Sequence, residues 1–156
     1  MGYAGSDGTC ARCPAGTGAI STRTGCTQCD AYSAGSDGTC TTCGDGDTPN
    51  ADRTSCVNCG VGTAGTGGDC VDCGVGQEPN ADRTACQACA VGYAGTSGVC
   101  ELCAPGTEPD VSQAVCVSCA AGFAGSDGTC AVCADGTEPN EDMTACQPCA
   151  PGWAGK

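Results

Sequence analysis

Residues 40–59 read C-T-T-C-G-D-G-D-T-P-N-A-D-R-T-S-C-V-N-C, in which two C-x-x-C pairs flank twelve residues rich in turn formers. This arrangement returns along the whole chain, in ten C-x-x-C pairs whose first cysteines are spaced alternately 16 and 14 residues apart. The two spacings together make a 30-residue repeat, and such a fixed period indicates an array of similar structural units. We read residues 1–156 as one continuous array, with repeats at about 2–31, 32–61, 62–91, 92–121 and 122–151 and a partial repeat at 152–156.

The composition leaves little material for a hydrophobic core. The chain has 156 residues, a net charge of -13 and no histidine, and it contains one Leu, one Ile, one Phe and one Trp. A chain of this kind without cysteines would be disordered. Cross-links must therefore take the place of a core, as they do in small secreted modules. Closing a loop of ~15 residues with a disulfide contributes about 3 kcal/mol, so a series of such loops is sufficient in magnitude.

The residues between the cysteines are turn signals. The first half of a repeat reads G-aromatic-A-G-S-D-G-T-C, as at residues 2–10, and the second half reads P-N-x-D-x-T-x-C, as at residues 49–56 and 79–86. Gly, Pro, Asn and Asp at such positions favour tight turns, and no apolar period of 3.6 residues predicts a helix. We predict a small disulfide-rich fold of irregular backbone and short β-hairpins, whose tandem repeats form an elongated rod.

The two ends of the chain fall inside a repeat, because Met1 holds the repeat position of Val61 and Lys156 that of Ser6. We therefore expect a segment of a longer array. The sequence contains no secretory leader and no apolar run long enough to insert in a membrane. Because stable disulfides need an oxidising compartment, we expect an extracellular or cell-surface location.

Regular spacing leaves two disulfide orders open. In the first order, the second cysteine of each pair joins the first cysteine of the next pair, as in Cys13–Cys26 and Cys29–Cys40, and Cys10 and Cys149 are left over. In the second order, neighbouring pairs interlock as Cys10–Cys26 with Cys13–Cys29, and no cysteine is left over. A disulfide within one C-x-x-C is typical of redox enzymes and is labile.

Two stretches resemble a known class of module. They are C-P-A-G-T at residues 13–17 with C-x-x-C at 26–29, and C-A-P-G-T at residues 103–107 with C-x-x-C at 116–119. This pattern resembles the cysteine-rich repeats called ephrin-receptor-like, which are similar in turn to the first module of tumour-necrosis-factor receptors. The form G-T-E-P-N-x-x-x-T-A-C-x-x-C also resembles repeats in protist surface proteins, including ciliate immobilisation antigens and the variant surface proteins of flagellate parasites. The resemblance extends over the whole chain through its Cys, Gly and Pro spacing.

The resemblance implies an extracellular module in which one disulfide closes each loop, and hence the first order. The bonded pairs would be Cys13–Cys26, Cys29–Cys40, Cys43–Cys56, Cys59–Cys70, Cys73–Cys86, Cys89–Cys100, Cys103–Cys116, Cys119–Cys130 and Cys133–Cys146. Partners for Cys10 and Cys149 would then lie beyond this segment.

Metal binding is the main alternative for the cysteines. The C-x-x-C-(12)-C-x-x-C spacing is typical of a four-thiolate zinc site, but zinc ribbons usually carry basic residues, and this chain has only five. We therefore favour disulfides over zinc. Aspartates in the turns keep weak calcium binding as an alternative, although they lack the spacing of a 12-residue calcium loop. These aspartates are Asp7, Asp37, Asp45, Asp47, Asp52, Asp82, Asp127 and Asp142.

Other functions find less support in the residues. The negative charge repels nucleic acid, and no pair of nucleophile and base indicates an enzyme, so we expect neither catalysis nor a cofactor. No asparagine begins an N-glycosylation sequon, whereas O-linked glycans on Thr and Ser are compatible with the turns. Four aromatic residues share one repeat position, and we expect their rings to cover the neighbouring disulfides, with a packing stripe on the rod as the alternative. They are Tyr3, Tyr93, Phe123 and Trp153.

These observations favour a structural repeat segment of a secreted or cell-surface fibril, coat or appendage. Its expected partner is the protein itself, through end-to-end continuation or lateral bundling. A binding module of the receptor or variant-surface-antigen type is the alternative, and a four-thiolate zinc array is the third hypothesis.

Overall fold

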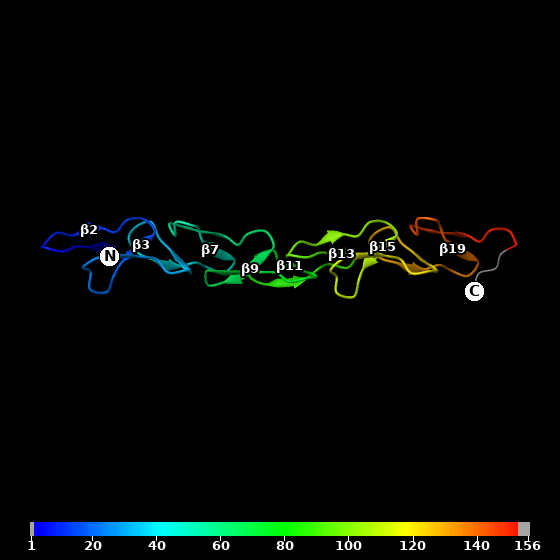
Figure 1. Ribbon diagram of the computed structural model, residues 1–156, viewed down its shortest axis with the longest axis horizontal. Coiled ribbons are helices and arrows are strands. Elements are labelled where there is room, and N and C mark those ends of the chain that lie inside the picture. The colour runs from blue at the N-terminus through cyan, green and yellow to red at the C-terminus, as the bar shows by residue number, and fades with distance from the viewer. Residues whose placement is uncertain (1, 153–156) are drawn as a thin grey trace. The chain divides into compact units, whose positions relative to one another are not determined.

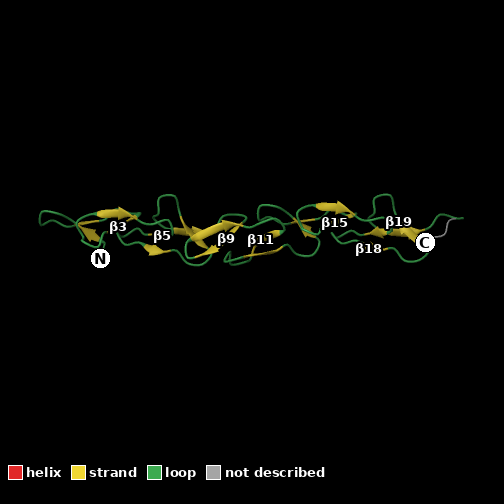
Figure 2. Cartoon of the chain, turned by 60° about the horizontal axis from the view of Figure 1, so that its bottom comes forward, coloured by secondary structure: helices red, strands yellow, loops and turns green. Residues whose placement is uncertain are grey.

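The computed structural model describes residues 2–152, and its regular structure is entirely β (Figures 1 and 2). Each repeat contains two antiparallel hairpins, which we call its first and second hairpin. The strands of the first hairpins are β1 (Tyr3–Ala4), β2 (Ala11–Arg12), β5 (Ser33–Ala34), β6 (Thr41–Thr42), β9 (Thr63–Thr66), β10 (Asp69–Asp72), β13 (Tyr93–Ala94), β14 (Glu101–Leu102), β17 (Phe123–Ala124) and β18 (Ala131–Val132). The strands of the second hairpins are β3 (Thr17–Ala19), β4 (Cys26–Gln28), β7 (Asp47–Pro49), β8 (Cys56–Asn58), β11 (Gln77–Pro79), β12 (Cys86–Ala88), β15 (Thr107–Pro109), β16 (Cys116–Ser118), β19 (Thr137–Pro139) and β20 (Cys146–Pro148).

The prediction of a small disulfide-rich fold with short hairpins and irregular connections is confirmed. Figure 2 shows the short strands separated by long loops, with no helix between residues 2 and 152. Within that range, accordingly, no helix is long and apolar enough to span a membrane.

The first hairpins depend on glycine at their turns. In the hairpin that pairs Tyr3 with Arg12, the amide of Thr9 donates to the carbonyl of Ser6 at 3.1 Å. The two central residues, Asp7 and Gly8, have φ values of 54° and 79°. Positive φ at both central residues is the type I′ geometry, which matches the twist of paired strands, and Asp-Gly is one of its preferred sequences.

The second hairpins depend on the asparagine that follows proline. Pro49 ends β7 opposite Cys56, and the Asn50 side chain then closes the turn. Its Oδ1 accepts the amides of Thr54 at 2.9 Å and Ser55 at 3.3 Å, and its Nδ2 donates to the Thr54 hydroxyl at 3.0 Å. The recurring motif P-N-x-D-x-T therefore encodes a turn that is stabilised by hydrogen bonds from its own side chains.

The interior of the fold repeats with the sequence. The buried apolar residues are small and belong to two kinds, the alanine of the first hairpin's first strand and the second cysteine of a C-x-x-C pair. They are Ala4, Ala34, Ala64, Ala94 and Ala124 together with Cys13, Cys29, Cys43, Cys59, Cys73, Cys89, Cys103 and Cys119. Most larger apolar side chains, including every valine, are exposed. Sulfur and methyl groups thus form a series of small cores instead of one large core.

The described chain divides into two compact units. Unit 1 comprises Met1–Asp72 and Pro79–Cys86, and unit 2 comprises Cys73–Glu78 and Gln87–Lys156. Within each unit, successive hairpins follow the order of the chain, and the same contacts recur every 30 residues. The 30-residue frame is therefore visible in each unit taken by itself.

Candidate functional site: the disulfide ladder

The cysteines are joined as simple loops, from the second cysteine of one pair to the first cysteine of the next. The bonds are Cys13–Cys26, Cys29–Cys40, Cys43–Cys56, Cys59–Cys70, Cys89–Cys100, Cys103–Cys116, Cys119–Cys130 and Cys133–Cys146. Cys73 and Cys86 are disulfide-bonded as well. Cys10 and Cys149 are free thiols, the first exposed and the second half-buried.

Each bond joins one hairpin to the next. Cys13 follows strand β2 of a first hairpin, and its partner Cys26 begins strand β4 of the second hairpin. Cys29 then follows β4 and bonds Cys40, which precedes β6. Loops with sequence separations of 13 and 11 residues therefore alternate along the chain, and no two of them overlap.

In this oxidised form, the bonded sulfur atoms are not available as thiolate ligands. The zinc alternative needs four thiolates at each site. Around the described residues, no group of three or more His, Cys, Asp or Glu side chains is placed to hold a metal ion.

Backbone hydrogen bonds between glycines and the next hairpins connect the loops. In unit 1, the amide of Gly16 donates to the carbonyl of Gly35 at 2.7 Å, and the amide of Gly35 donates to the carbonyl of Arg53 at 2.9 Å. In unit 2, Gly106 donates to Gly125 at 2.7 Å, and Gly125 donates to Met143 at 2.9 Å. We call these contacts the glycine bridges. They join each hairpin to the one that follows it in the chain, in addition to the disulfides.

Glycine is required because the backbones approach each other closely at the same places. A Cβ placed on Gly16 would lie 2.2 Å from the carbonyl oxygen of Asp52, and one on Gly106 would lie 2.2 Å from that of Asp142. Both glycines also have positive φ, 76° and 79°. A side chain at either position would therefore separate two turns that now touch.

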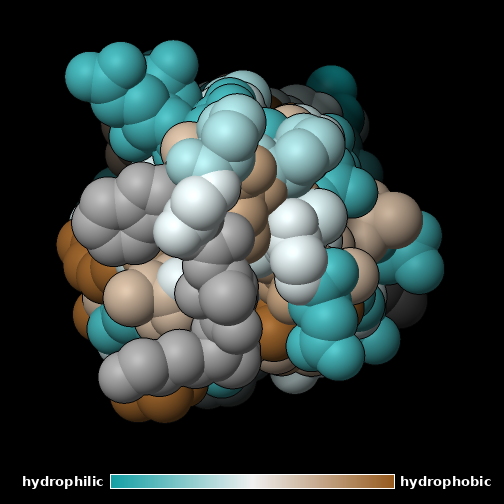
Figure 3. All heavy atoms as spheres, turned by 90° about the vertical axis from the view of Figure 1, so that its right-hand side faces the viewer, coloured by the Kyte–Doolittle hydropathy of each residue, from teal (hydrophilic) through white to brown (hydrophobic). Residues whose placement is uncertain are grey.

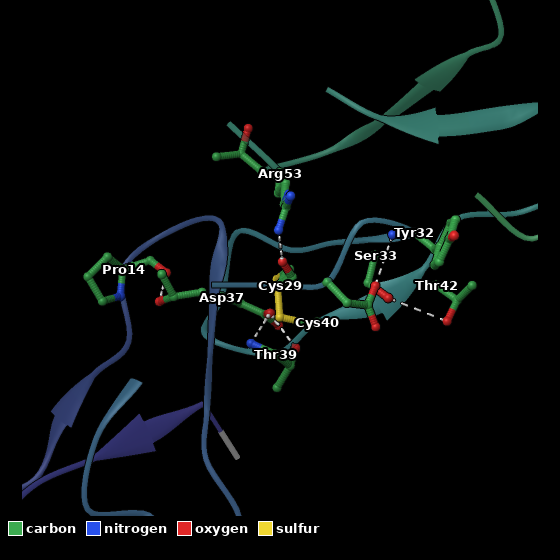
Figure 4. Close-up of a disulfide and its surroundings, with 12 residues drawn as sticks. Pro14, Cys29, Tyr32, Ser33, Asp37, Thr39, Cys40, Thr42 and Arg53 are labelled. Carbon is green, nitrogen blue, oxygen red and sulfur yellow. Dashed lines mark hydrogen bonds between the residues drawn. A yellow bond between two sulfur atoms is a disulfide. The ribbon is translucent and has the colours of Figure 1, made fainter. Parts of the chain in front are cut away.

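An arginine clamp accompanies the glycine bridges. Arg53 has a φ of 56°, unusual for a residue with a side chain, and its guanidinium Nη1 donates to the carbonyl of Cys29 (Figure 4). Arg83 repeats the contact on the carbonyl of Cys59. Gln113 replaces arginine in the fourth repeat, and its amide donates to the carbonyl of Cys89 at 3.1 Å. The clamp residue therefore donates a hydrogen bond to the carbonyl of a buried, disulfide-bonded cysteine in the preceding repeat.

Aspartates of the turns are used locally. Figure 4 shows Asp37 beside Thr39, whose hydroxyl and amide both donate to the carboxylate. The hydroxyl contact, followed by the amide contact, lowers the pKa of Asp37 below its ordinary value. Asp127 likewise accepts the hydroxyl of Thr129 at 2.8 Å. Two of the carboxylates that could be read as calcium ligands, those of Asp37 and Asp127, thus cap their own turns.

The aromatic residues that share one repeat position keep part of their surface exposed where the structure describes them. Tyr3 and Phe123 are 53% and 37% exposed, and Tyr93 is half-buried. Trp153 lies outside the described residues. On the face in Figure 3, hydrophobic residues form small separate groups among hydrophilic ones. Both the cover over the disulfides and the packing stripe stay predictions.

Sequence reasoning missed the glycine bridges and the arginine clamp. Their only trace in the sequence is that glycine and arginine recur at fixed places in the 30-residue frame. No protein-family model matches the chain, and a comparison with curated proteins also found no match.

Proposed function

We propose that this chain is a structural repeat segment of a secreted or cell-surface fibril, coat or appendage, held by disulfides and without catalysis or a cofactor. The observation that carries the proposal is that the repeats use the same structural residues. The buried alanines, buried cysteines, loops and glycine bridges recur in the same frame in both units. A protein built in this way gains length with each added repeat, while its solvated carboxylates maintain solubility.

The test compares chains of different length in solution. Inserting two further copies of residues 62–91 keeps the cysteine frame, and we expect the maximum dimension from small-angle X-ray scattering to increase in proportion to the number of repeats. A dithiol reductant should convert each chain to a coil, whereas a chelator should leave its circular dichroism unchanged. A dimension that grows as slowly as that of a globule, or unfolding by the chelator, would show that the chain is not a disulfide-held structural rod.

A hollow in the fourth repeat, with exposed valines in and near it, favours a binding module as the second candidate. The hollow, about 430 Å³ in volume, is lined in part by Val99, Leu102 and Val115. Val111 and Val117 of the same repeat are also exposed. No other repeat in unit 2 carries these valines, so this repeat has a surface of its own.

Substitution separates the two candidates. We expect Val115→Thr and Leu102→Thr to leave the length dependence unchanged under the structural proposal. If the unmodified chain binds cells or an extracellular ligand and these variants do not, with an unchanged scattering profile, the result would favour the binding module.

A further inference from the structure

The clamp position is not filled by a hydrogen-bond donor in every repeat. It is held by Arg53 and Arg83 in unit 1 and by Gln113 and Met143 in unit 2. The two arginines and the glutamine each donate to a cysteine carbonyl of the preceding repeat. A methionine side chain has no donor, so it cannot make this contact. The junction between the fourth and fifth repeats therefore differs from the three junctions before it.

The Cys119 carbonyl is the acceptor that the methionine leaves without a clamp. Among residues 2–152, no side chain donates to this carbonyl, whereas the matching carbonyl at each of the three preceding junctions accepts a side-chain donor. Cys119 is disulfide-bonded to Cys130 of the fifth repeat, so the covalent link across the junction is retained. The missing contact is one that holds the two repeats together without a covalent bond.

The backbone contacts across this junction match those of a clamped junction. The amides of Gly106 and Gly16 each donate to a glycine carbonyl of the next repeat, at 2.7 Å in both cases. A Cβ on either glycine would lie 2.2 Å from an aspartate carbonyl oxygen, that of Asp142 or Asp52. The closed geometry is therefore the same with and without the clamp, and the clamp acts on how readily the junction opens.

The charges of the turn add to this difference. In unit 1, an aspartate directly precedes each of the two clamp arginines, so these turns carry both signs of charge. In the fifth repeat, Glu141 and Asp142 precede Met143, and residues 87–152 contain no lysine or arginine. Like charges that no cation balances destabilise the compact state through repulsion. Both the missing donor and the unbalanced carboxylates therefore favour the open form of this junction.

We propose that the junction between the fourth and fifth repeats is a yielding joint, at which neighbouring repeats separate more readily than at the clamped junctions. Opening breaks the hydrogen bond from Gly106 to Gly125 and separates Gly106 from Asp142, while the Cys119–Cys130 disulfide keeps the chain connected. The proposal rests on the proposed function and adds to it a place where the segment bends without losing covalent continuity.

Hydrogen exchange of four glycine amides measures this opening. Gly16, Gly46, Gly76 and Gly106 each donate to a glycine carbonyl of the following repeat, so their protection factors compare four junctions within one chain. We expect Gly106 to be about tenfold less protected than Gly16 and Gly46, because a hydrogen bond from a charged donor stabilises by at least roughly this factor. Gly76, whose clamp is the uncharged Gln113, should fall between them.

Substitution at Met143 separates the missing donor from other causes of opening. Met143→Arg supplies the donor, and Met143→Leu is the matched control, because leucine is of similar size and also has no donor. We expect Met143→Arg to raise the protection factor of the Gly106 amide about tenfold and Met143→Leu to leave it unchanged.

The reverse substitution tests the same contact in unit 1. Arg53 and Met143 both have a φ of 56°, so Arg53→Met removes the donor at a position whose backbone already accepts methionine elsewhere in the chain. We expect Arg53→Met to lower the protection factor of the Gly16 amide about tenfold and to leave that of Gly46 unchanged.

Two results would overturn the yielding joint. One is a Gly106 amide as well protected as that of Gly16 in the unmodified chain, and the other is an unchanged Gly106 protection factor in Met143→Arg. Either result leaves the length dependence and the reductant sensitivity of the proposed function intact. A maximum dimension that grows as slowly as that of a globule would instead reject the proposed function, whatever the exchange rates show.

Discussion

At the scale of single residues, the fold depends on glycines, which lack a side chain, and on residues whose side chains hydrogen-bond to the backbone. Gly106 allows two turns to touch, and Arg53 adopts positive φ while its guanidinium reaches the carbonyl of Cys29. Such residues contribute more to the fold than the few large apolar residues, most of which are exposed.

The close approach at Gly106 predicts a large effect from one methyl group. Gly106→Ala places a Cβ 2.2 Å from the Asp142 carbonyl oxygen, whereas Gly136→Ala has the same positive φ without a described neighbour. Both variants should lose about 1–2 kcal/mol from the unfavourable φ, and Gly106→Ala should lose about 1–3 kcal/mol more from the clash. Hydrogen exchange of the amide that donates to each glycine's carbonyl, Cys119 for Gly106 and Cys149 for Gly136, gives the local opening free energy. Equal losses in the two variants would contradict the close contact.

At the scale of the hairpins, each loop is an independent covalent unit. The Cys103–Cys116 bond joins a first hairpin to the following second hairpin and involves no residue of another loop. Because the hairpins contact mainly their neighbours, damage to one loop should remain local.

Removing one disulfide tests this independence. We expect Cys103→Ser with Cys116→Ser, in a background without Cys10 and Cys149, to lower the local free energy of unfolding by about 2–5 kcal/mol. Hydrogen exchange by mass spectrometry should increase in residues 92–121 and remain unchanged in residues 2–61. The background chain is the control, and exchange that rises evenly over the whole chain would show that the loops are coupled.

The sequence predicts the hairpins and leaves their connections open. Asp7-Gly8 and Pro49-Asn50 are local signals, so the turns can be recognised from adjacent residues. The order of the disulfides cannot be recognised in this way, because both regular schemes satisfy the same spacing. The contact of Arg53 with Cys29 joins residues 24 positions apart. It also depends on the positive φ of Arg53, which the neighbouring residues do not predict.

At the scale of the whole molecule, the chain carries a net charge of -13, and some of its carboxylates cap turns. Asp110 replaces the capping asparagine of the second, third and fifth repeats and accepts the Ala114 amide at 2.7 Å. The Ser112 hydroxyl is the main cause of its lowered pKa, and the amides of Val115 and Ala114 add to the effect. In unit 1, hydrogen bonds likewise lower the pKa values of the Asp30 and Asp37 carboxyl groups.

Acid should therefore loosen some turns and spare others. A carboxyl whose folded pKa is lowered stabilises the fold above its unfolded pKa of about 3.9, and this contribution is lost as the pH falls through the folded pKa. We expect the protection factor of the Ala114 amide to fall below about pH 4. The Thr84 amide, which the uncharged Asn80 side chain accepts at 2.9 Å, should keep its protection and serves as the internal control. Parallel loss at both amides would indicate general acid unfolding instead.

The separate loops also determine how the chain responds to tension. Pulling force crosses each sulfur–sulfur bond directly, so the chain between two bonded cysteines, whose sequence separation is 11 or 13, stays slack while the two residues inside each C-x-x-C bear the load. Cleaving one bond between cysteines 13 positions apart brings the chain between them into the load path and lengthens the strand by roughly 40 Å, at the usual reach of an extended chain. Extensibility is thus stored in discrete steps that a reductant releases one by one.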